Sequence, residues 1–179
     1  MILYRVFPYD SSAPPTESGG ALFAPHSSAG RIANPDLYSE LYLSTTAAGA
    51  LSEAFGRLDT WRASTLVYEP WPYALAEFEL DDNARICNLD NAGRLLSYEL
   101  APSEVVARDR NVTRAWAARI YRAKKWNGIA WWSHYESRWQ SMGLWQRRGL
   151  RLLRTPEPLS LAHAAVRDAA VLLPRRIAE

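Results

Sequence analysis

The segment AGRIANPDLYSELYLSTTAAGALSEAFG, residues 29–56, decides the fold because it joins a loop, a strand and a helix in one short stretch. A polar Gly-Arg loop comes first. Residues 41–43, Leu-Tyr-Leu, then have the composition of a short strand. Thr45 or Thr46 follows with a hydroxyl that can accept amide protons from the first turn of a helix, which we expect to run through Phe55.

Outside this segment, short strands and helices alternate along the chain. Residues 10–20 and 27–35 are rich in Ser, Pro and Gly and predict loops. Predicted strands cover residues 2–7, 64–68, 74–80, 85–89, 128–133 and 150–153, and predicted helices cover the stretch from a cap at Asp90 to Tyr98 and residues 112–123 and 161–173. This mixture is typical of an α+β domain, and we expect one compact domain over residues 1–179.

Composition excludes several classes of protein. The chain is 48% hydrophobic and 22% charged, as ordinary globular domains are, and its net charge of +2 gives no general reason to expect nucleic-acid binding. A single cysteine, Cys87, cannot form an internal disulfide. No run approaches the roughly 20 apolar residues of a membrane span. The first six residues lack the order of a signal peptide, so we expect a cytoplasmic protein.

Familiar motifs for phosphate binding and metal binding are missing from the sequence. There is no Walker sequence and no Gly-x-Gly-x-x-Gly after a strand. His26, His134 and His163 lie at spacings unlike those of metal ligands, which predicts that no metal is bound. Basic residues gather late in the chain, at positions 147, 148, 151, 154, 175 and 176. They form either a solvated face or a surface for phosphates or an acidic partner.

A second stretch, NGIAWWS at residues 127–133, completes a pattern that begins in the segment quoted first. In chain order, the pattern has Arg5 in the opening strand, Arg31 in the Gly-Arg loop, Tyr42 in the strand, Glu53 in the helix and Ser133 after the downstream strand. This order resembles the RES domain, a family named for an Arg, a Glu and a Ser. The resemblance covers most of the chain.

Three features depart from the family's usual pattern. Ile32 follows the Gly-Arg pair where the family often has an aromatic residue. Trp131 and Trp132 precede the serine in place of Tyr-Pro, and residues 34–40 replace a shorter Pro-Gly turn. These changes concern the shape of the pocket and leave the catalytic positions in place.

The resemblance implies an α+β, mixed-sheet fold related to that of the ADP-ribosyltransferase toxins. It also implies an enzyme that cleaves the nicotinamide–ribose bond of NAD⁺, as an NAD⁺ phosphorylase or an NAD⁺ glycohydrolase. Such proteins are toxins of bacterial type II toxin–antitoxin pairs, and their expected partner is a helix-turn-helix antitoxin. We expect no cofactor beyond NAD⁺ as substrate and no metal, since the cationic nicotinamide is already a good leaving group.

The resemblance gives each matched residue a role. Arg31 is suited to clamp the pyrophosphate with its planar fork, and Arg5 either helps there or pairs with a carboxylate. Tyr42 can stack on the nicotinamide ring. Glu53 can stabilise an oxocarbenium-like ribose, and Ser133 can hydrogen-bond the ribose, the carboxamide or the acceptor. Without the resemblance, these five residues would be read as ion pairs, a core tyrosine, a solvated glutamate and a strand-end hydroxyl.

Two other functions fit parts of the sequence. The same fold can transfer ADP-ribose to a protein. Alternatively, the aromatic and basic run from Trp139 to Arg151 can serve a nucleic-acid-binding module without enzymatic activity. The enzymatic interpretation makes a geometric prediction: residues 128–133 run beside or across from residues 41–43, and Tyr42, Glu53 and Ser133 open on one pocket that reaches a slightly buried Arg31.

Overall fold

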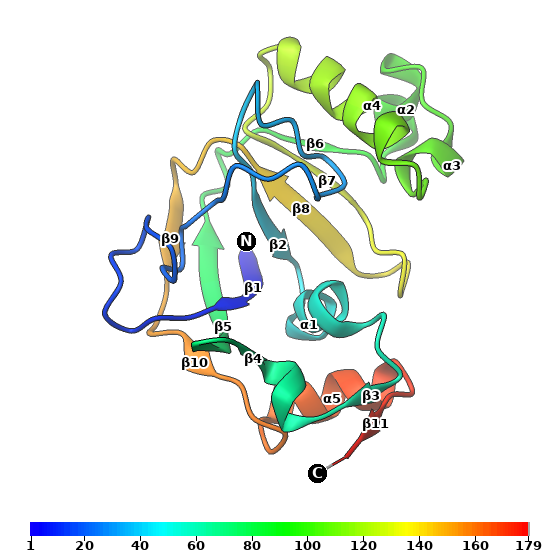
Figure 1. The fold of residues 1–179 in the computed structure, drawn as a ribbon. Helices are drawn as coiled ribbons and strands as arrows, with labels where there is room; N and C mark the ends of the chain where they lie inside the picture. Colours follow the sequence, from blue (N-terminus) through cyan, green and yellow to red (C-terminus); the bar gives the residue numbers. More distant parts are fainter. Residues whose placement is uncertain (179) are drawn as a thin grey trace.

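A computed structural model, which describes residues 1–178, has a mixed β-sheet at its centre (Figure 1). In spatial order its strands are β10 (Glu157–Pro158), β5 (Trp71–Leu80), β1 (Ile2–Pro8), β2 (Leu41–Ser44), β8 (Gln140–Leu144), β7 (Gly128–Trp132) and β6 (Ile86–Asn88). Neighbours along this path are antiparallel except β6 and β7, which are parallel. β5 also pairs with β4 (Val67–Tyr68) and β9 (Leu150–Leu152).

The helices lie in two groups at opposite ends of the sheet (Figure 1). Near β7 are α2 (Ala92–Ser97), α3 (Pro102–Val105) and α4 (Arg110–Arg122). At the other end, α1 (Ala47–Phe55) packs on α5 (Ala164–Leu172), beside a 3₁₀ helix over Ala63–Leu66 and a small parallel pair of β3 (Thr60–Trp61) and β11 (Arg176–Ile177). This arrangement confirms the predicted α+β class.

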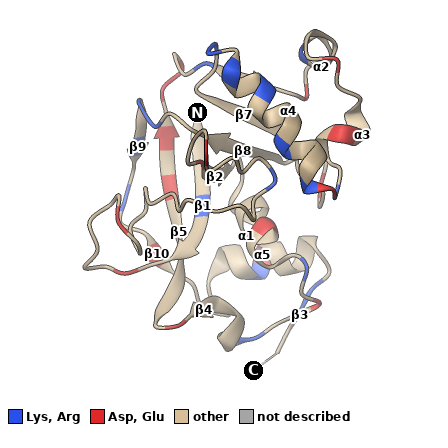
Figure 2. Ribbon diagram, turned by 45° about the horizontal axis from the view of Figure 1, so that its top comes forward, with Lys and Arg blue, Asp and Glu red and all other residues tan. Residues whose placement is uncertain are grey.

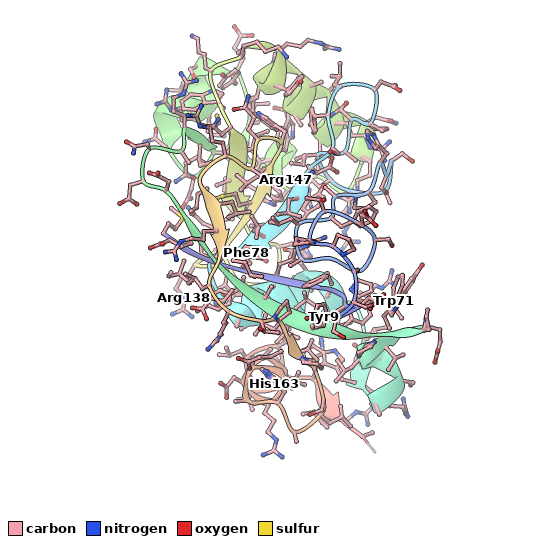
Figure 3. The ribbon with its side chains drawn as sticks, turned by 90° about the vertical axis from the view of Figure 1, so that its left-hand side faces the viewer. Tyr9, Trp71, Phe78, Arg138, Arg147 and His163 are labelled. Atoms are coloured by element: carbon pink, nitrogen blue, oxygen red, sulfur yellow. The ribbon has the colours of Figure 1, made fainter. Side chains whose placement is uncertain are left out.

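Alternation along the strands divides the sheet into two faces. One face carries an apolar core that includes Leu3, Phe7 and Leu43, together with the fully buried Phe78. Figure 3 shows Phe78 toward one end of β5 and Trp71 at the other end, near Tyr9. The opposite face is covered by the two helical groups, and the gap between these groups is where the cavities described below lie.

Most elements that the sequence predicts are present with shifted ends. α1 begins where expected, because the Thr46 hydroxyl accepts from the Gly49 amide at 2.9 Å. Two predictions were wrong. Most of residues 64–68 lies in the 3₁₀ helix, which leaves a strand of only two residues, and Asn91 rather than Asp90 caps α2. The final helix begins at Ala164, three residues later than expected, after a cap at His163 (labelled in Figure 3).

β8 is the main element that the sequence analysis missed. This strand lies between β2 and β7, so the predicted neighbourhood of residues 41–43 and 128–133 is wrong in detail: one strand separates them. Its Gly143 lies directly under Ile32, and a Cβ at position 143 would lie 2.1 Å from the Ile32 Cδ1 atom. The loop that holds Ile32 and Arg31 therefore packs closely against the sheet.

Candidate active site

A cavity of about 310 Å³ opens between the sheet, α1 and the loop that carries Arg31. The sheet contributes Tyr42 from β2, Trp131 from β7 and Ser141 from β8, and the helix contributes Glu53. Four of the five residues matched in the sequence, Arg5, Arg31, Tyr42 and Glu53, therefore border one cavity. Its exposed lining is more apolar than polar, as is usual for small-molecule sites.

The aromatic wall of the cavity is fixed by packing and by one hydrogen bond. The Tyr42 and Trp131 rings meet nearly at right angles, with centroids 6.2 Å apart. The Tyr42 hydroxyl accepts from the Ile32 amide at 3.0 Å, and burial raises the pKa of this tyrosine, so the hydroxyl stays protonated. Gly30 lies against the ring, where an added Cβ would be 2.2 Å from the hydroxyl oxygen. Tyr42 is thus held in a single position.

Glu53 is exposed on α1, yet one of its carboxylate oxygens is firmly held. Oε1 accepts hydrogen bonds from the Ser133 hydroxyl at 3.1 Å and the Ser141 hydroxyl at 3.0 Å. Both serines are almost fully buried. Within residues 1–178, no donor contacts the other oxygen, Oε2. Two buried hydroxyls therefore orient the carboxylate and leave one oxygen for a ligand.

Ser133 contacts Glu53, as its place in the pattern suggests, but it does not line the cavity. Its hydroxyl donates to Glu53 and accepts from the Tyr135 amide at 3.2 Å. Ser141, which the sequence analysis missed, has the position that borders the cavity. Because Ser141 lies on the strand that was not predicted, only its pairing with β7 and β2 brings it to the site.

Arg31 is half-buried, so the expectation of slight burial was wrong. Its Nη1 atom donates to the carbonyls of Val105 and Ala107, at 3.2 and 2.8 Å, and its own carbonyl accepts from the Thr113 hydroxyl at 2.6 Å. Burial lowers the pKa of Arg31, and the positive charge of Arg110 lowers it further. Arg31 therefore borders the cavity and also ties its loop to the region around α3 and α4.

Arg5 has a different environment from the other matched residues. Strand alternation places it with Leu3 and Phe7, on the face of the sheet opposite Tyr42. Its Nη1 and Nη2 atoms donate to the carbonyls of Ala21 and Phe23, at 2.6 and 2.7 Å. Burial lowers its pKa to about 9, and nearby Arg147 adds to that effect. Arg5 borders the cavity, but these contacts support the loop at residues 21–23.

A second, more open hollow of about 760 Å³ adjoins the cavity and shares Arg31, Glu53 and Arg110 with it. We call this hollow the arginine basin, and define it by Arg31, Arg57, Arg108, Arg110 and Arg175, with His134, Tyr135 and Glu53 at its edge. Of the late arginines singled out in the sequence, only Arg175 reaches it. Arg147 donates to the Leu22 carbonyl, and Arg151 pairs with Glu79.

Two further features are absent from residues 1–178. No helix in this range has the length and apolar character needed to cross a bilayer. No three His, Cys, Asp or Glu side chains in it converge as metal ligands would.

Comparison with known proteins agrees with this architecture. The fold is similar to that in a crystal structure of the M. tuberculosis MbcT-MbcA toxin-antitoxin complex, with a TM-score of 0.62 and 15% sequence identity. The match covers 98% of this chain and 88% of the other. No curated protein matches the chain in sequence. At this identity the likeness defines the class of fold.

The family follows from the sequence itself. The model of the RES domain family matches residues 2–166, which is nearly the whole chain. The chain belongs to the RES domain family, and the resemblance drawn from its Arg, Glu and Ser positions is confirmed.

Proposed function

We propose that this chain is a toxin that consumes NAD⁺ by breaking the bond between nicotinamide and ribose at the cavity described above. The observation that carries the proposal is the position of Glu53. Its carboxylate, held by two buried hydroxyls, lies where an aromatic cavity meets an arginine-rich hollow. A substrate with a flat cationic ring and a diphosphate needs these surroundings on the two sides of its ribose.

In this proposal the nicotinamide ring enters the cavity and lies against Tyr42 and Trp131. The bond from the ring nitrogen to ribose C1′ breaks, and its electron pair leaves with neutral nicotinamide. Positive charge then develops on the ribose, and the free Oε2 of Glu53 stabilises it more strongly than it stabilises the substrate. An acceptor oxygen bonds to C1′ and gives its proton to solvent.

The acceptor decides which enzyme this is. Water would yield ADP-ribose, phosphate would yield a 1-phosphorylated ADP-ribose, and a protein side chain would yield a modified protein. The structure gives less support to nucleic-acid binding by the Trp139–Arg151 run. Two of its arginines already have partners: Arg147 donates to the Leu22 carbonyl, and Arg151 pairs with Glu79.

The test is to incubate the purified chain with NAD⁺ and follow free nicotinamide by chromatography, with Glu53→Gln as the matched control. We expect nicotinamide release by the wild type and a loss on the order of 10² or more in the variant. Product analysis with and without phosphate, and with no other protein present, identifies the acceptor. Intact NAD⁺ after incubation with folded wild-type protein would refute the proposal.

We also propose an antitoxin partner, expected to be of the helix-turn-helix type, because the similar M. tuberculosis structure is described as a toxin-antitoxin complex. Expression of the wild type in bacteria should then lower cellular NAD⁺ and arrest growth, whereas Glu53→Gln should do neither. Co-expression with the proposed helix-turn-helix antitoxin should restore both. If Glu53→Gln were as toxic as the wild type, growth arrest would have a cause other than the proposed cleavage of NAD⁺.

A further inference from the structure

The arginine basin has a strong imbalance of charge. Five arginines line it, and among residues 1–178 the only carboxylate in its lining is Glu53. The five come from separate parts of the chain: the end of α1, the region before and at the start of α4, the loop after α5 and the Arg31 loop. In Figure 2, basic residues colour the start of α4 and the loops beside α5 and β3.

The basin arginines differ in what already binds them. Arg175 is committed to the fold, since its Nε and Nη2 atoms donate to the Gly56 carbonyl at 3.1 and 2.6 Å. Arg57, Arg108 and Arg110 are exposed, and no acceptor or carboxylate within residues 1–178 engages their guanidinium groups. Glu53 is therefore the one carboxylate in the described lining of the basin that faces their charges.

The cavity beside Glu53 is small, and its size indicates which part of a dinucleotide would lie in the arginine basin. At about 310 Å³ it lies at the lower end of the volumes usual for small-molecule sites, and this suits a nicotinamide ring and its ribose better than a whole dinucleotide. With the ribose beside Glu53, the remainder of the molecule must leave through the adjoining hollow. The first groups to enter that hollow would be the two phosphates.

We propose that Arg57, Arg108 and Arg110 form a subsite for the diphosphate of the dinucleotide, beyond the contact expected of Arg31. The proposal rests on the function proposed above. Arginine suits the task, because its planar donors match phosphate oxygens and its charge is permanent. The subsite makes the enzyme select intact dinucleotides over nicotinamide riboside, which has the same reacting bond and no phosphate. Binding energy from this remote part of the substrate would also position the ribose against Glu53.

The test uses the double variant Arg57→Gln/Arg108→Gln, since neither side chain supports the fold. The matched control is Arg122→Gln/Arg148→Gln, which removes the same charge at two exposed arginines away from the basin. We expect kcat/KM for NAD⁺ to fall roughly tenfold or more in the basin variant, while cleavage of nicotinamide riboside stays within about twofold. The control variant should keep wild-type values for both substrates.

A binding measurement separates this proposal from the proposed reaction. Calorimetric titration with ADP-ribose, which keeps the diphosphate and lacks nicotinamide, should show a Kd roughly tenfold higher in the basin variant only. If the wild type binds ADP-ribose through these arginines but leaves NAD⁺ intact, the reaction fails and the subsite stands. If NAD⁺ is cleaved and the basin variant matches the control, the subsite is refuted.

Free orthophosphate could bind the same arginines as the diphosphate of NAD⁺. A further experiment therefore distinguishes these two ligands. Rates are measured over a range of phosphate concentrations, including none. We expect the basin variant to raise the KM for NAD⁺ even without phosphate. A variant that keeps the wild-type KM and loses only the dependence on phosphate would overturn the proposal, because the basin would then hold the acceptor.

Discussion

Replacing Ser141 by alanine tests whether the orientation of Glu53 matters for turnover. The substitution removes one of the two hydrogen bonds to Oε1, at 3.0 Å, and leaves the 3.1 Å bond from Ser133. A hydrogen bond to a charged group contributes about 1.5–3 kcal/mol, and the exposure of Glu53 argues for the lower end. A loss of about 1.4 kcal/mol corresponds to about a tenfold decrease in kcat.

The assay measures kcat and KM for nicotinamide release in Ser141→Ala, Ser133→Ala and the double variant, each with and without Glu53→Ala. We expect kcat to fall about tenfold for either serine with KM little changed, and to fall further when both are removed. In the Glu53→Ala background the serine substitutions should have no further effect, because the hydroxyls act through that carboxylate. An equal loss in both backgrounds would refute a positioning role, as would full activity of Ser141→Ala. Melting temperatures check that each variant folds.

Three other substitutions test the parts of the site separately. Gly30→Ala should lower kcat/KM for NAD⁺ by an order of magnitude or so, because the new Cβ displaces the Tyr42 ring; unchanged kinetics would show that the ring position is unimportant. Arg31→Ala should lower both activity and stability, the latter by about 1–3 kcal/mol in urea unfolding, because the Val105 and Ala107 carbonyls lose their donor; unchanged stability would contradict this. Burial raises the pKa of Glu40 to about 7 from an ordinary 4.5, so its contribution to stability is greatest below pH 4.5 and is lost as the pH rises through 7. Glu40→Gln should therefore raise the melting temperature more at about pH 8 than at about pH 5, and the reverse order would show that burial is not the dominant cause.

The sequence predicts the elements that have a clear local signal. The Leu-Tyr-Leu strand and its threonine-capped helix are correct, because alternation and capping depend on neighbours in the chain. β8 has no such signal. Its sequence, Gln140 to Leu144, has a glycine at the fourth of five positions and two polar residues, and its strand conformation depends on pairing with β2 and β7. Tertiary pairing, rather than local preference, decides such a segment.

Some residues of the candidate site can likewise be predicted from the sequence, and others cannot. Arg31, Glu53 and Ser133 could be found because they fall in a family pattern. Ser141 could not, because it lies on the strand that was missed. The basin arginines lie in four separate parts of the chain, on loops and at helix ends, where single charged residues are usually only solvated. Nothing in their spacing indicates that they converge, so only the folded chain relates them to Glu53.

The distance along the chain between Glu53 and its two serines has a consequence for protein synthesis. The hydroxyls that hold the carboxylate come 80 and 88 positions later. A nascent chain that has been translated only through β7 already contains the carboxylate, the aromatic residues and Arg31, but it lacks both hydroxyls and the strand between β2 and β7. Domains acquire their long-range contacts only when the pairing segments have been made. If the proposed function holds, an unfinished polypeptide that ends before β8 should therefore not cleave NAD⁺, and activity should arise only after β8 has been made and has paired with β2 and β7.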